Sequence, residues 1–382
     1  ANIAILNVDH PDIIEFINAK RNGLFNNFNI SVAVTDKFME AVKKNRYFEL
    51  RNPQTRKVER RIRARRIFNE IVKNAWERGD PGIIFIDEIN RKNPLKLGKI
   101  EATNPCGEQP LYPYESCNLG SVNLSNMVKD GKIDWNRLKK TIHSAVHFLD
   151  NVIDVNKFPL PEIEKATKAS RKIGLGVMGF AEFLIKLDIS YNSEEAIKTA
   201  EKLMRFITME ARKKSEILGK ERGSFPNFKK SRLYGKYKAM RNATVTTIAP
   251  TGTISIIAGT SSGIEPLFSL VFTRRILGGK EFKEVNKLYA AALKKGRLTK
   301  KQKKVFVTAM EIEPEYHIRM QAAFQKYTDN AVSKTVNLPT GATINKVKNI
   351  FMLAYDLKCK GITIYRYGSK EQQVLNVCKE CI

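Results

Sequence analysis

The sequence predicts a soluble globular protein with an α/β fold, and three observations support this expectation. Along residues 1–90, short β-branched or apolar runs alternate with amphipathic helical patterns, as strands and helices alternate in such folds. Hydrophobic residues make up 42% and charged residues 28% of the 382 residues, which is typical of a soluble globular protein. No apolar run reaches the roughly 18 residues that a membrane-spanning helix needs, so we expect no membrane among its partners.

The first elements follow from capping residues, turn residues and periodicity. We expect a strand over 3–8, a helix from Asp9 to about Ala19, a strand over 29–34, a helix capped by Thr35 or Asp36 and running through Lys44, a hairpin over 48–58, a helix over 64–78 and a strand over 83–86. The sequence Gly-Asp-Pro-Gly at 79–82 separates the last two because glycine and proline end helices.

The later elements continue the same alternation. We expect helices over 135–150, 180–187, 316–327 and 344–358, a polar helical pattern over 164–172, and strands over 244–248 and 361–365. The strand over 244–248 enters a turn over 249–255 and then continues into 256–258, where the residues are largely β-branched.

The chain is strongly basic, with 67 basic and 39 acidic residues and a net charge of +28. Much of the excess lies in three runs, at 56–66, 229–241 and 294–304. We interpret them as solvated helix faces and turns, with attraction of a polyanionic nucleotide as a second interpretation. Nucleic-acid binding is a third, although no zinc-finger pattern or RNA-recognition motif accompanies the runs.

Five cysteines in 382 residues are too few for a disulfide scaffold. The first residues lack the basic start and long apolar core of a signal peptide. We therefore expect a reducing, cytoplasmic location. Cys359, at the end of a predicted helix, is interpreted as structural.

Two of the cysteines lie in the segment 104–121, NPCGEQPLYPYESCNLGS. Asn104 and Glu108 stand two residues on either side of Cys106, and the proline and glycine between them indicate a loop. Such a turn can point all three side chains into one small volume. A thiol can give up a proton or a hydrogen atom, a carboxylate can act as a general base, and an amide can hold hydroxyl groups. Cys117 follows after enough chain to return beside the loop; the alternative is that both cysteines are small buried hydrophobic residues.

Residues 249–255 are a second candidate site, composed of Ala249, Pro250, Thr251, Gly252, Thr253, Ile254 and Ser255. A strand that ends in a turn rich in glycine and hydroxyl groups can present N–H and O–H donors to an anion. The Gly-Lys-Ser/Thr of a Walker loop does not follow, and an ordinary loop explains these residues equally well.

Three further patterns have both a functional and a structural explanation. His143 and His147 are four residues apart, but without a third partner they indicate core or surface histidines, and we expect no metal site. Residues 174–179 match G-x-G-x-x-G, but a polar helical pattern precedes them, so we favour close packing of a loop over a dinucleotide site. Cys378 and Cys381 form a C-x-x-C, which is a redox pair, half of a zinc site, or neither.

The chain resembles a known family. NPCGE at 104–108, followed by ESCNLGSVNL at 115–124, looks like the active-site loop of the large catalytic chain of ribonucleotide reductase. Four further segments are similar to the adenosylcobalamin-dependent (class II) branch and occur in the family's order: 1–17, 172–184, 242–268 and 361–375. The resemblance implies a ten-stranded α/β barrel of the type shared with glycyl radical enzymes, here lacking its first strands. It would occupy residues 1–370, with a C-terminal tail over 371–382.

The resemblance also implies roles for single residues. Cys106 matches the cysteine that becomes a thiyl radical and removes the 3′ hydrogen of the ribose. Glu108 matches the base that takes the 3′-hydroxyl proton, and Asn104 matches the amide that holds the ribose hydroxyls. Cys117 matches one of two cysteines that supply electrons and end as a disulfide.

Two other segments receive roles by resemblance. The loop at 249–255, with Pro250 to Ser255, looks like the one that cradles the substrate's phosphates. Cys378 and Cys381 are similar to tail cysteines that reduce the active site again. The implied reaction is reduction of ribonucleoside di- or triphosphates to 2′-deoxyribonucleotides, with a thioredoxin-like protein or a small dithiol as reductant.

The implied radical source is adenosylcobalamin. Class I members pass the radical through a tyrosine pair, and this chain has no Tyr-Tyr dipeptide. In the family, the partner of Cys117, the first barrel strands and the usual allosteric region precede the segment at 1–17. The resemblance therefore implies the C-terminal portion of a reductase, either a fragment or one product of a split gene, and we expect the N-terminal half as a separate chain. Whether the chain forms a homodimer is left open. The alternatives are an inactive, basic nucleic-acid-binding or scaffold derivative, and a class I large chain with a metal-radical partner.

Overall fold

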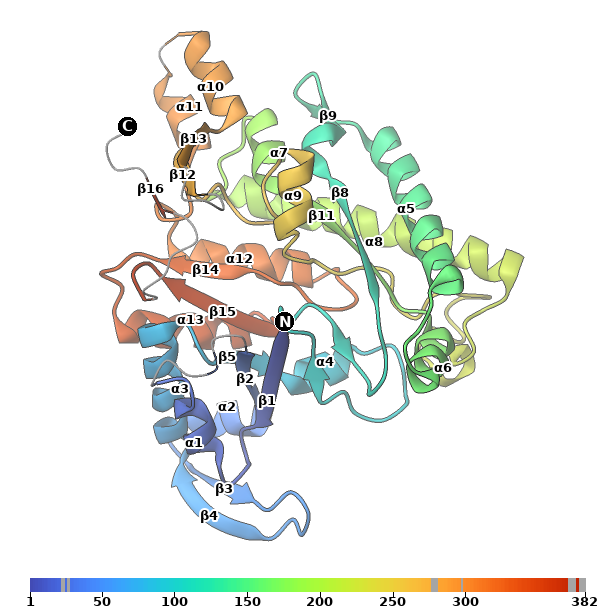
Figure 1. Cartoon of the computed structure of the whole chain (residues 1–382), viewed down its shortest axis with the longest axis vertical. Helices are drawn as coiled ribbons and strands as arrows, with labels where there is room; N and C mark the ends of the chain where they lie inside the picture. Colours follow the sequence, from blue (N-terminus) through green and yellow to red (C-terminus); the bar gives the residue numbers. More distant parts are fainter. Residues whose placement is uncertain (22–24, 26–27, 276–280, 297, 370–375, 378–382) are drawn as a thin grey trace.

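A computed structural model describes residues 1–382 except 22–24, 26–27, 276–280, 297, 370–375 and 378–382 (Figure 1). The strands are β1 (Asn2–Asn7), β2 (Phe28–Val34), β3 (Tyr47–Arg51), β4 (Val58–Arg63), β5 (Gly82–Phe85), β6 (Ala102–Thr103), β7 (Pro110–Leu111), β8 (Asn118–Asn123), β9 (Val128–Lys129), β10 (Lys132–Ile133), β11 (Ile173–Met178), β12 (Val271–Arg275), β13 (Glu281–Val285), β14 (Thr335–Leu338), β15 (Gly361–Arg366) and β16 (Asn376–Val377).

The helices alternate with these strands, as expected for an α/β fold. They are α1 (Ile13–Asn18), α2 (Asp36–Lys43), α3 (Ala64–Arg78), α4 (Ile86–Lys92), α5 (Trp135–Val155), α6 (Pro161–Ser170), α7 (Phe180–Lys186), α8 (Glu194–Arg222), α9 (Gly252–Ala258), α10 (Lys287–Lys294), α11 (Lys300–Val305), α12 (Pro314–Gln325) and α13 (Ile344–Asp356), with short 3-10 turns at Leu124–Met127 and Phe228–Lys230.

The main sheet has the strand order β1-β2-β5-β15-β14. β1, β2 and β5 are parallel to one another, β15 is antiparallel to β5, and β14 is parallel to β15. Single parallel bridges extend this sheet: Val332 pairs with Ile248, and Thr246 pairs with Leu175 of β11, which lies parallel to β8. The pairing therefore runs as one arc from β1 to β8.

The ten-stranded barrel, expected here without its first strands, is not confirmed, because the described residues form no closed sheet. β1 pairs only with β2, and β8 pairs only with β11 in this part of the chain. The α/β class is confirmed, whereas closure of the sheet into a barrel is not, because no ladder joins the two edge strands.

Two hydrophobic cores cover the two ends of the arc. One packs α1, α2, α3 and α13 against the main sheet, and the other packs α5, α7, α8 and α12 around β8 and β11. α3 shows why these helices form: Ile67, Phe68, Ile71 and Val72 make one buried stripe, and Gly79 ends the helix with φ +80°. The predicted bounds of this helix, 64–78, agree with the structure.

Three local expectations were wrong. Residues 244–248, expected as a strand, form only the single bridges of Thr246 and Ile248. Residues 174–178 lie in a fully buried strand, β11, rather than in a loop. Residues 256–258 belong to α9 rather than to a strand. Thr251 reverses the chain with φ +56°, and its hydroxyl accepts a hydrogen bond from the Gly263 N–H at 2.7 Å, so a distant contact starts this helix.

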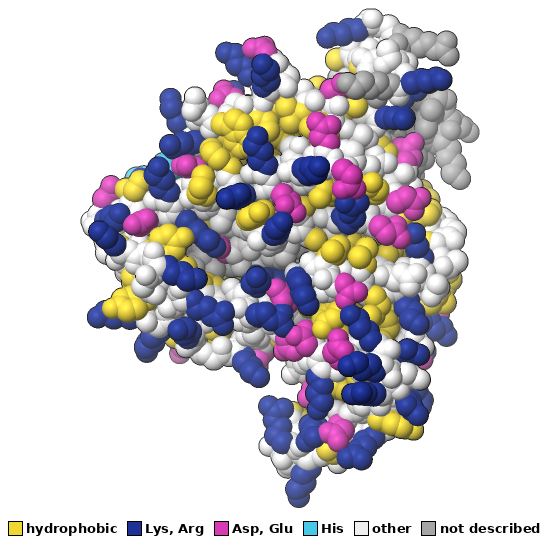
Figure 2. All heavy atoms as spheres, turned by 180° about the vertical axis from the view of Figure 1, so that it is seen from behind, with side chains coloured by type: hydrophobic (Ala, Val, Ile, Leu, Met, Phe, Trp, Pro, Cys, Tyr) yellow, Lys and Arg dark blue, Asp and Glu magenta, His cyan; other side chains and the backbone are white. Residues whose placement is uncertain are grey.

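The basic side chains are dispersed. Figure 2 shows Lys and Arg spread over the face seen from behind, with Asp and Glu between them. In the run at 56–66, the basic residues are exposed on the β3–β4 hairpin and its continuation, whereas Ile62 points into the core. None of the described helices is both long and apolar enough to span a membrane.

Candidate functional site

Cys106 lies in the turn of the short hairpin formed by β6 and β7. Gly107 closes the turn with φ +82°, a conformation that glycine adopts without strain, and donates its N–H to the Asn104 carbonyl at 3.0 Å. The Asn104 N–H donates to the Gln109 carbonyl at 3.1 Å, and the Gln109 N–H donates to Asn104 Oδ1 at 2.9 Å. The local sequence thus builds a hydrogen-bonded turn that presents the thiol.

The hairpin is attached to both parts of the arc. The Glu108 carbonyl accepts hydrogen bonds from the Ala331 N–H and from the Thr247 hydroxyl, each at 2.9 Å. On the other side, the Asn29 amide, at the start of β2, donates to the Pro105 carbonyl at 3.0 Å. Segments far apart in the sequence therefore fix the position of the turn.

Glu108 is the buried acid of this turn. Its side chain is 2% exposed, and Oε2 has no hydrogen-bond partner in the structure. Burial raises the pKa of the carboxyl group, while hydrogen bonds from its own backbone and from the Asn104 side chain act in the opposite direction. The sequence-predicted trio of Asn104, Cys106 and Glu108 is therefore brought together.

The Cys106 thiol is exposed. Partial desolvation raises its pKa, and the negative charge of Glu108 raises it further. The thiol therefore remains protonated at neutral pH, which is the form that can give up a hydrogen atom.

Cys117 directly precedes β8 and is partly buried. Burial raises the pKa of its thiol well above the usual range; Lys172 lowers this pKa, while Glu115 and then Glu108 raise it. The carboxylate of Glu108 acts on both thiols, so Cys117 lies within electrostatic reach of the Cys106 turn.

A hollow with about 390 Å³ of empty space, part of it open to solvent, adjoins Cys106. Gln321, one of its polar residues, is 1% exposed and has no partner for Oε1. The lining residues are Ile3, Ser31, Ile83, Ile84, Pro105, Cys106, Gly107, Gln321, Val332, Ser333, Lys334, Gly361, Ile362 and Thr363. The exposed thiol thus meets a partly polar space enclosed by strands of the main sheet.

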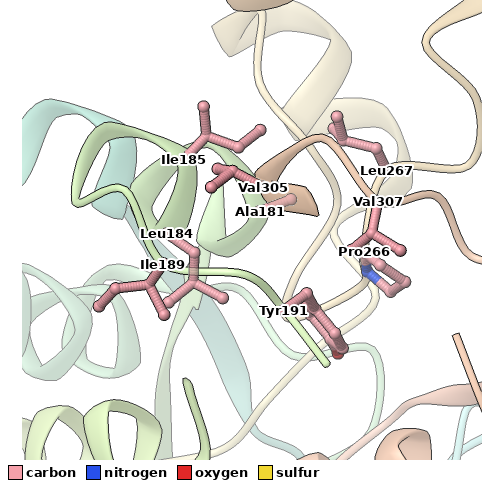
Figure 3. A pocket seen from close by; sticks show the side chains of 9 residues that line it. All are labelled: Ala181, Leu184, Ile185, Ile189, Tyr191, Pro266, Leu267, Val305 and Val307. Atoms are coloured by element: carbon pink, nitrogen blue, oxygen red, sulfur yellow. The ribbon is translucent and has the colours of Figure 1, made fainter. Parts of the chain in front are cut away.

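A second hollow lies beside α7, and the side chains that line it are apolar except for one tyrosine (Figure 3). Tyr191 is the one lining residue with a polar side chain, and its hydroxyl donates to the Ile264 carbonyl at 2.8 Å. The lining residues are Ala181, Leu184, Ile185, Ile189, Tyr191, Pro266, Leu267, Val305 and Val307. Among the described residues, no cysteine, histidine, lysine or carboxylate lines this hollow.

The loop at 249–255 continues the segment that holds the hairpin through Thr247. Gly252 and Thr253 are exposed at the start of α9, whereas Ser255 is buried and its hydroxyl lies 2.9 Å from that of Ser262. The exposed part leaves backbone N–H groups free to face a ligand.

The two histidines of α5 have separate partners. His143 Nε2 lies 2.7 Å from Glu210, and Arg222 donates to His147 Nε2 at 2.8 Å. Within the described part of the chain, no group of three or more His, Cys, Asp and Glu side chains is arranged to hold a metal ion.

The remaining cysteines lie elsewhere. Cys359 is 1% exposed and belongs to the core beneath α13, in agreement with a structural role. Cys378 and Cys381 lie outside the described residues.

Sequence reasoning missed two charged residues of the site, Glu115 and Lys172. Their side chains are 3% and 1% exposed and form an ion pair of 2.5 Å beside Cys117. The available signal was weak: Glu115 stands two residues before Cys117, and Lys172 stands directly before an apolar strand.

An α/β arc that presents a protonated thiol beside a buried carboxylate and an amide defines a protein equipped for thiol chemistry. The family described as "Ribonucleotide reductase, barrel domain" matches residues 1–237 and 234–365. The chain belongs to this family.

Curated relatives agree with this membership. The chain is 52% identical, over 98% of its length, to a "Vitamin B12-dependent ribonucleoside-diphosphate reductase" of Thermoplasma acidophilum, covering 52% of that protein. It is 50% identical, again over 98%, to a protein of the same name from Mycobacterium tuberculosis, covering 58% of it. A "Ribonucleoside-diphosphate reductase subunit alpha" of Chlamydia pneumoniae is 32% identical over 78% of this chain, and the match covers 34% of that protein. The chain thus spans about half the length of the first two relatives.

Proposed function

We propose that this chain supplies the radical-bearing hairpin for the reduction of ribonucleotides to 2′-deoxyribonucleotides. The observation that carries the proposal is the β6–β7 turn, where an exposed thiol stands beside a buried carboxylate whose Oε2 has no partner. A buried acceptor without a partner costs free energy unless a ligand satisfies it, and a substrate hydroxyl is such a ligand.

The three side chains have distinct tasks in this reaction. Cys106, as a thiyl radical, removes a hydrogen atom from the ribose. Glu108 accepts the proton of the neighbouring hydroxyl, and its raised pKa brings it closer to neutral pH, as general-base catalysis requires. Asn104 Oδ1 is occupied by the Gln109 N–H, so its amide nitrogen is the end that can donate to a hydroxyl or to Glu108.

Residues 249–255 bind the substrate's phosphates in this proposal. The exposed N–H groups at Gly252 and Thr253 favour an anion, and the positive net charge of +28 attracts one. The names of the relatives favour a ribonucleoside diphosphate over a triphosphate.

Adenosylcobalamin, named for the relatives as vitamin B12, supplies the radical when bound. The residues present fit such a group, since Cys106 is exposed and adjoins a hollow lined by Ser31, Ser333 and Thr363. In this proposal these hydroxyl-bearing residues would line the space that the cofactor shares with the Cys106 thiol.

Completion of the site requires a second thiol beside Cys117. Of the cysteines that the structure describes, Cys359 is buried in another core and cannot serve. We infer that a separate N-terminal half brings this thiol and also the strands that close the ten-stranded barrel over 1–370. An external dithiol or thioredoxin-like protein in the cytoplasm then reduces the disulfide. Cys378 and Cys381 of the tail pass its electrons to the site. A homodimer is compatible with this assembly.

The test is reduction of a ribonucleoside diphosphate with adenosylcobalamin and dithiothreitol, using the chain with and without a supplied N-terminal half. We expect activity in the mixture, loss of at least a thousandfold in Cys106→Ser, and little change in the matched variant Cys359→Ser. No turnover in a mixture whose halves demonstrably associate would refute the cobalamin proposal. Activity restored by a metal-radical partner would then indicate class I, and salt-sensitive DNA binding without nucleotide binding would indicate the scaffold alternative.

A further inference from the structure

We propose that Lys172 is a positioning residue for Cys117, whose ammonium group stabilises the thiolate that this cysteine forms when its disulfide is reduced. The role in turnover rests on the function proposed above. The effect on the thiol is a property of this chain alone and can be measured without turnover.

The strand register brings the two residues together. β8 and β11 are parallel, with Asn118 opposite Ile173 as the first registered pair. Cys117 and Lys172 each stand one residue before that pair, and opposite residues of neighbouring strands present their side chains on the same face. Lys172 is accordingly the charged group that most strongly favours the Cys117 thiolate.

The backbone of Lys172 is fixed from both sides. Arg171 Nη2 donates to the buried Asp150 carboxylate at 2.8 Å, and the Arg171 carbonyl accepts from the Asn242 amide at 3.0 Å. The Ile173 N–H donates to the Thr244 carbonyl at 3.1 Å. The backbone on both sides of Lys172, directly before β11, is therefore held in place.

The ammonium group is buried as part of an ion pair. Lys172 Nζ lies 2.5 Å from Glu115 Oε2, and the side chains are 1% and 3% exposed. Glu115 Oε2 also accepts the Tyr112 N–H at 2.9 Å, and Lys172 Nζ lies 5.1 Å from the centre of the Tyr112 ring. Taking two charges out of water is costly, and their fields act more strongly on neighbours in such surroundings.

The charged groups around the thiol act against one another. Burial, Glu115 and Glu108 all oppose the thiolate, whereas Lys172 favours it. Without Lys172, three unfavourable influences would remain, and Cys117 would be a poorer leaving group.

The chemical step is disulfide exchange with an external dithiol. One thiolate of the dithiol attacks the sulfur bonded to Cys117, the S–S bond breaks, and Cys117 leaves with the electron pair as a thiolate, which then takes a proton. The dithiol is then joined by a mixed disulfide to the sulfur that had been bonded to Cys117. Its second thiol loses its proton and attacks the dithiol sulfur of this mixed disulfide, the S–S bond breaks, and the partner sulfur leaves as a thiolate that takes a proton. Two electrons thus pass from the dithiol to the site. Lys172 stabilises the negative charge at the moment when Cys117 leaves.

The test measures the rate of alkylation of reduced Cys117 by iodoacetamide from pH 7 to 10.5, quantified by peptide mass spectrometry. Cys106 in the same molecule is the internal reference. In Lys172→Met we expect the pH profile of Cys117 to shift upward by at least about one unit, so that its rate at pH 8.5 falls about tenfold. Lys172→Arg should keep the profile near that of the unchanged chain, because it keeps the charge.

Glu115→Gln provides a second, opposite test in case Lys172→Met does not fold. It keeps the ammonium group and removes one carboxylate, so we expect the Cys117 profile to shift downward while that of Cys106 stays in place. An unchanged Cys117 profile in folded Lys172→Met, an equal shift at Cys106, or an upward shift in Glu115→Gln would each overturn the inference. None of these readouts depends on ribonucleotide reduction, so its failure is distinguishable from failure of the proposed function.

Discussion

The carbonyl oxygen of Glu108 and the backbone N–H of Ala331 are joined by a hydrogen bond of 2.9 Å. The hydroxyl of Thr247 donates to the same carbonyl, also at 2.9 Å, and lies 3.1 Å from the Ala331 carbonyl. One buried threonine thus connects the candidate hairpin to the segment that contains Ala331.

Replacing this threonine by valine, Thr247→Val, should loosen the hairpin without changing its volume. We expect a loss of about 1 kcal/mol in the free energy of unfolding, because a buried hydrogen bond disappears while the Ala331 N–H still satisfies the Glu108 carbonyl. Urea denaturation measures the change. The control is Thr141→Val on α5, whose hydroxyl bonds only to the Arg137 carbonyl; an equal loss in both variants would contradict the special role of Thr247.

The buried carboxylate predicts a pH-dependent effect of Glu108→Gln. Because its folded pKa is raised above 4.5, the folded chain holds this proton more tightly, and stability is lost as pH rises from 4.5 through the folded pKa. Glu108→Gln should therefore be more stable than the unchanged chain at pH 8 and lose that advantage toward pH 4.5, while ribonucleotide reduction is abolished.

Urea midpoints of both chains across this pH range measure the difference. Glu59→Gln, at an exposed position of the β3–β4 hairpin, is the matched control and should show no comparable trend. If Glu108→Gln is less stable than the unchanged chain at pH 8, the carboxylate stabilises the fold, and the prediction of an unpaired, ligand-binding carboxylate is wrong.

Replacing a glycine of the G-x-G-x-x-G motif should disturb the packing of β11. A Cβ atom at Gly176 would lie 2.4 Å from the Thr247 carbonyl oxygen, so the segment at 244–248 could not stay in place. We expect Gly176→Ala to cost about 3 kcal/mol of folding stability. Thermal and urea unfolding measure this loss, and Gly341→Ala, where a Cβ meets nothing within 4 Å, is the control. Equal stability of the two variants would refute the close approach.

Burial of Lys360 should make the free energy of unfolding depend on pH, with the opposite sign to the dependence that Glu108 causes. Burial lowers its pKa from 10.5 to about 7, although its ammonium group donates to the Asp329 carbonyl at 2.7 Å. The unfolded chain therefore holds one proton more between pH 7 and 10.5, and stability rises with pH in this window by at most about 1.4 kcal/mol per unit. Lys360→Met should lack this rise.

The measurement is the difference in unfolding free energy between the two chains at pH 7, 8.5 and 10. Lys358→Met, at an exposed position two residues away, should keep the full pH dependence of the unchanged chain. Parallel curves for Lys360→Met and the unchanged chain would show that Lys360 keeps an ordinary pKa.

Much of the fold was predictable because its signals are local. The stripe of apolar residues in α3 and the glycine after it predicted that helix to the residue. The trio Asn104, Cys106 and Glu108 was likewise predictable, because the proline and glycine between them dictate a tight turn. Such features depend on residues within a few positions of one another.

The errors arose where distant contacts decide the local conformation. Ile256 and Ile257 favour a strand by propensity, yet the contact of Thr251 with Gly263 turns the chain into a helix. Gly174 and Gly176 suggested a loop, yet they lie in β11, where the close approach of Thr247 leaves no room for side chains. No window of a few residues contains either contact.

Neighbouring residues encode the α/β class, most helices, the turn that carries Cys106 and the family resemblance, so these features were predictable from the sequence. The tertiary structure adds three features that were not: the open arc of paired strands in the described chain, the burial of Glu108 with an unpaired oxygen, and the position of Lys172 beside Cys117. They depend on burial, and burial, with the pKa values and hydrogen bonds that follow from it, is set by what distant parts of a chain bring to a residue.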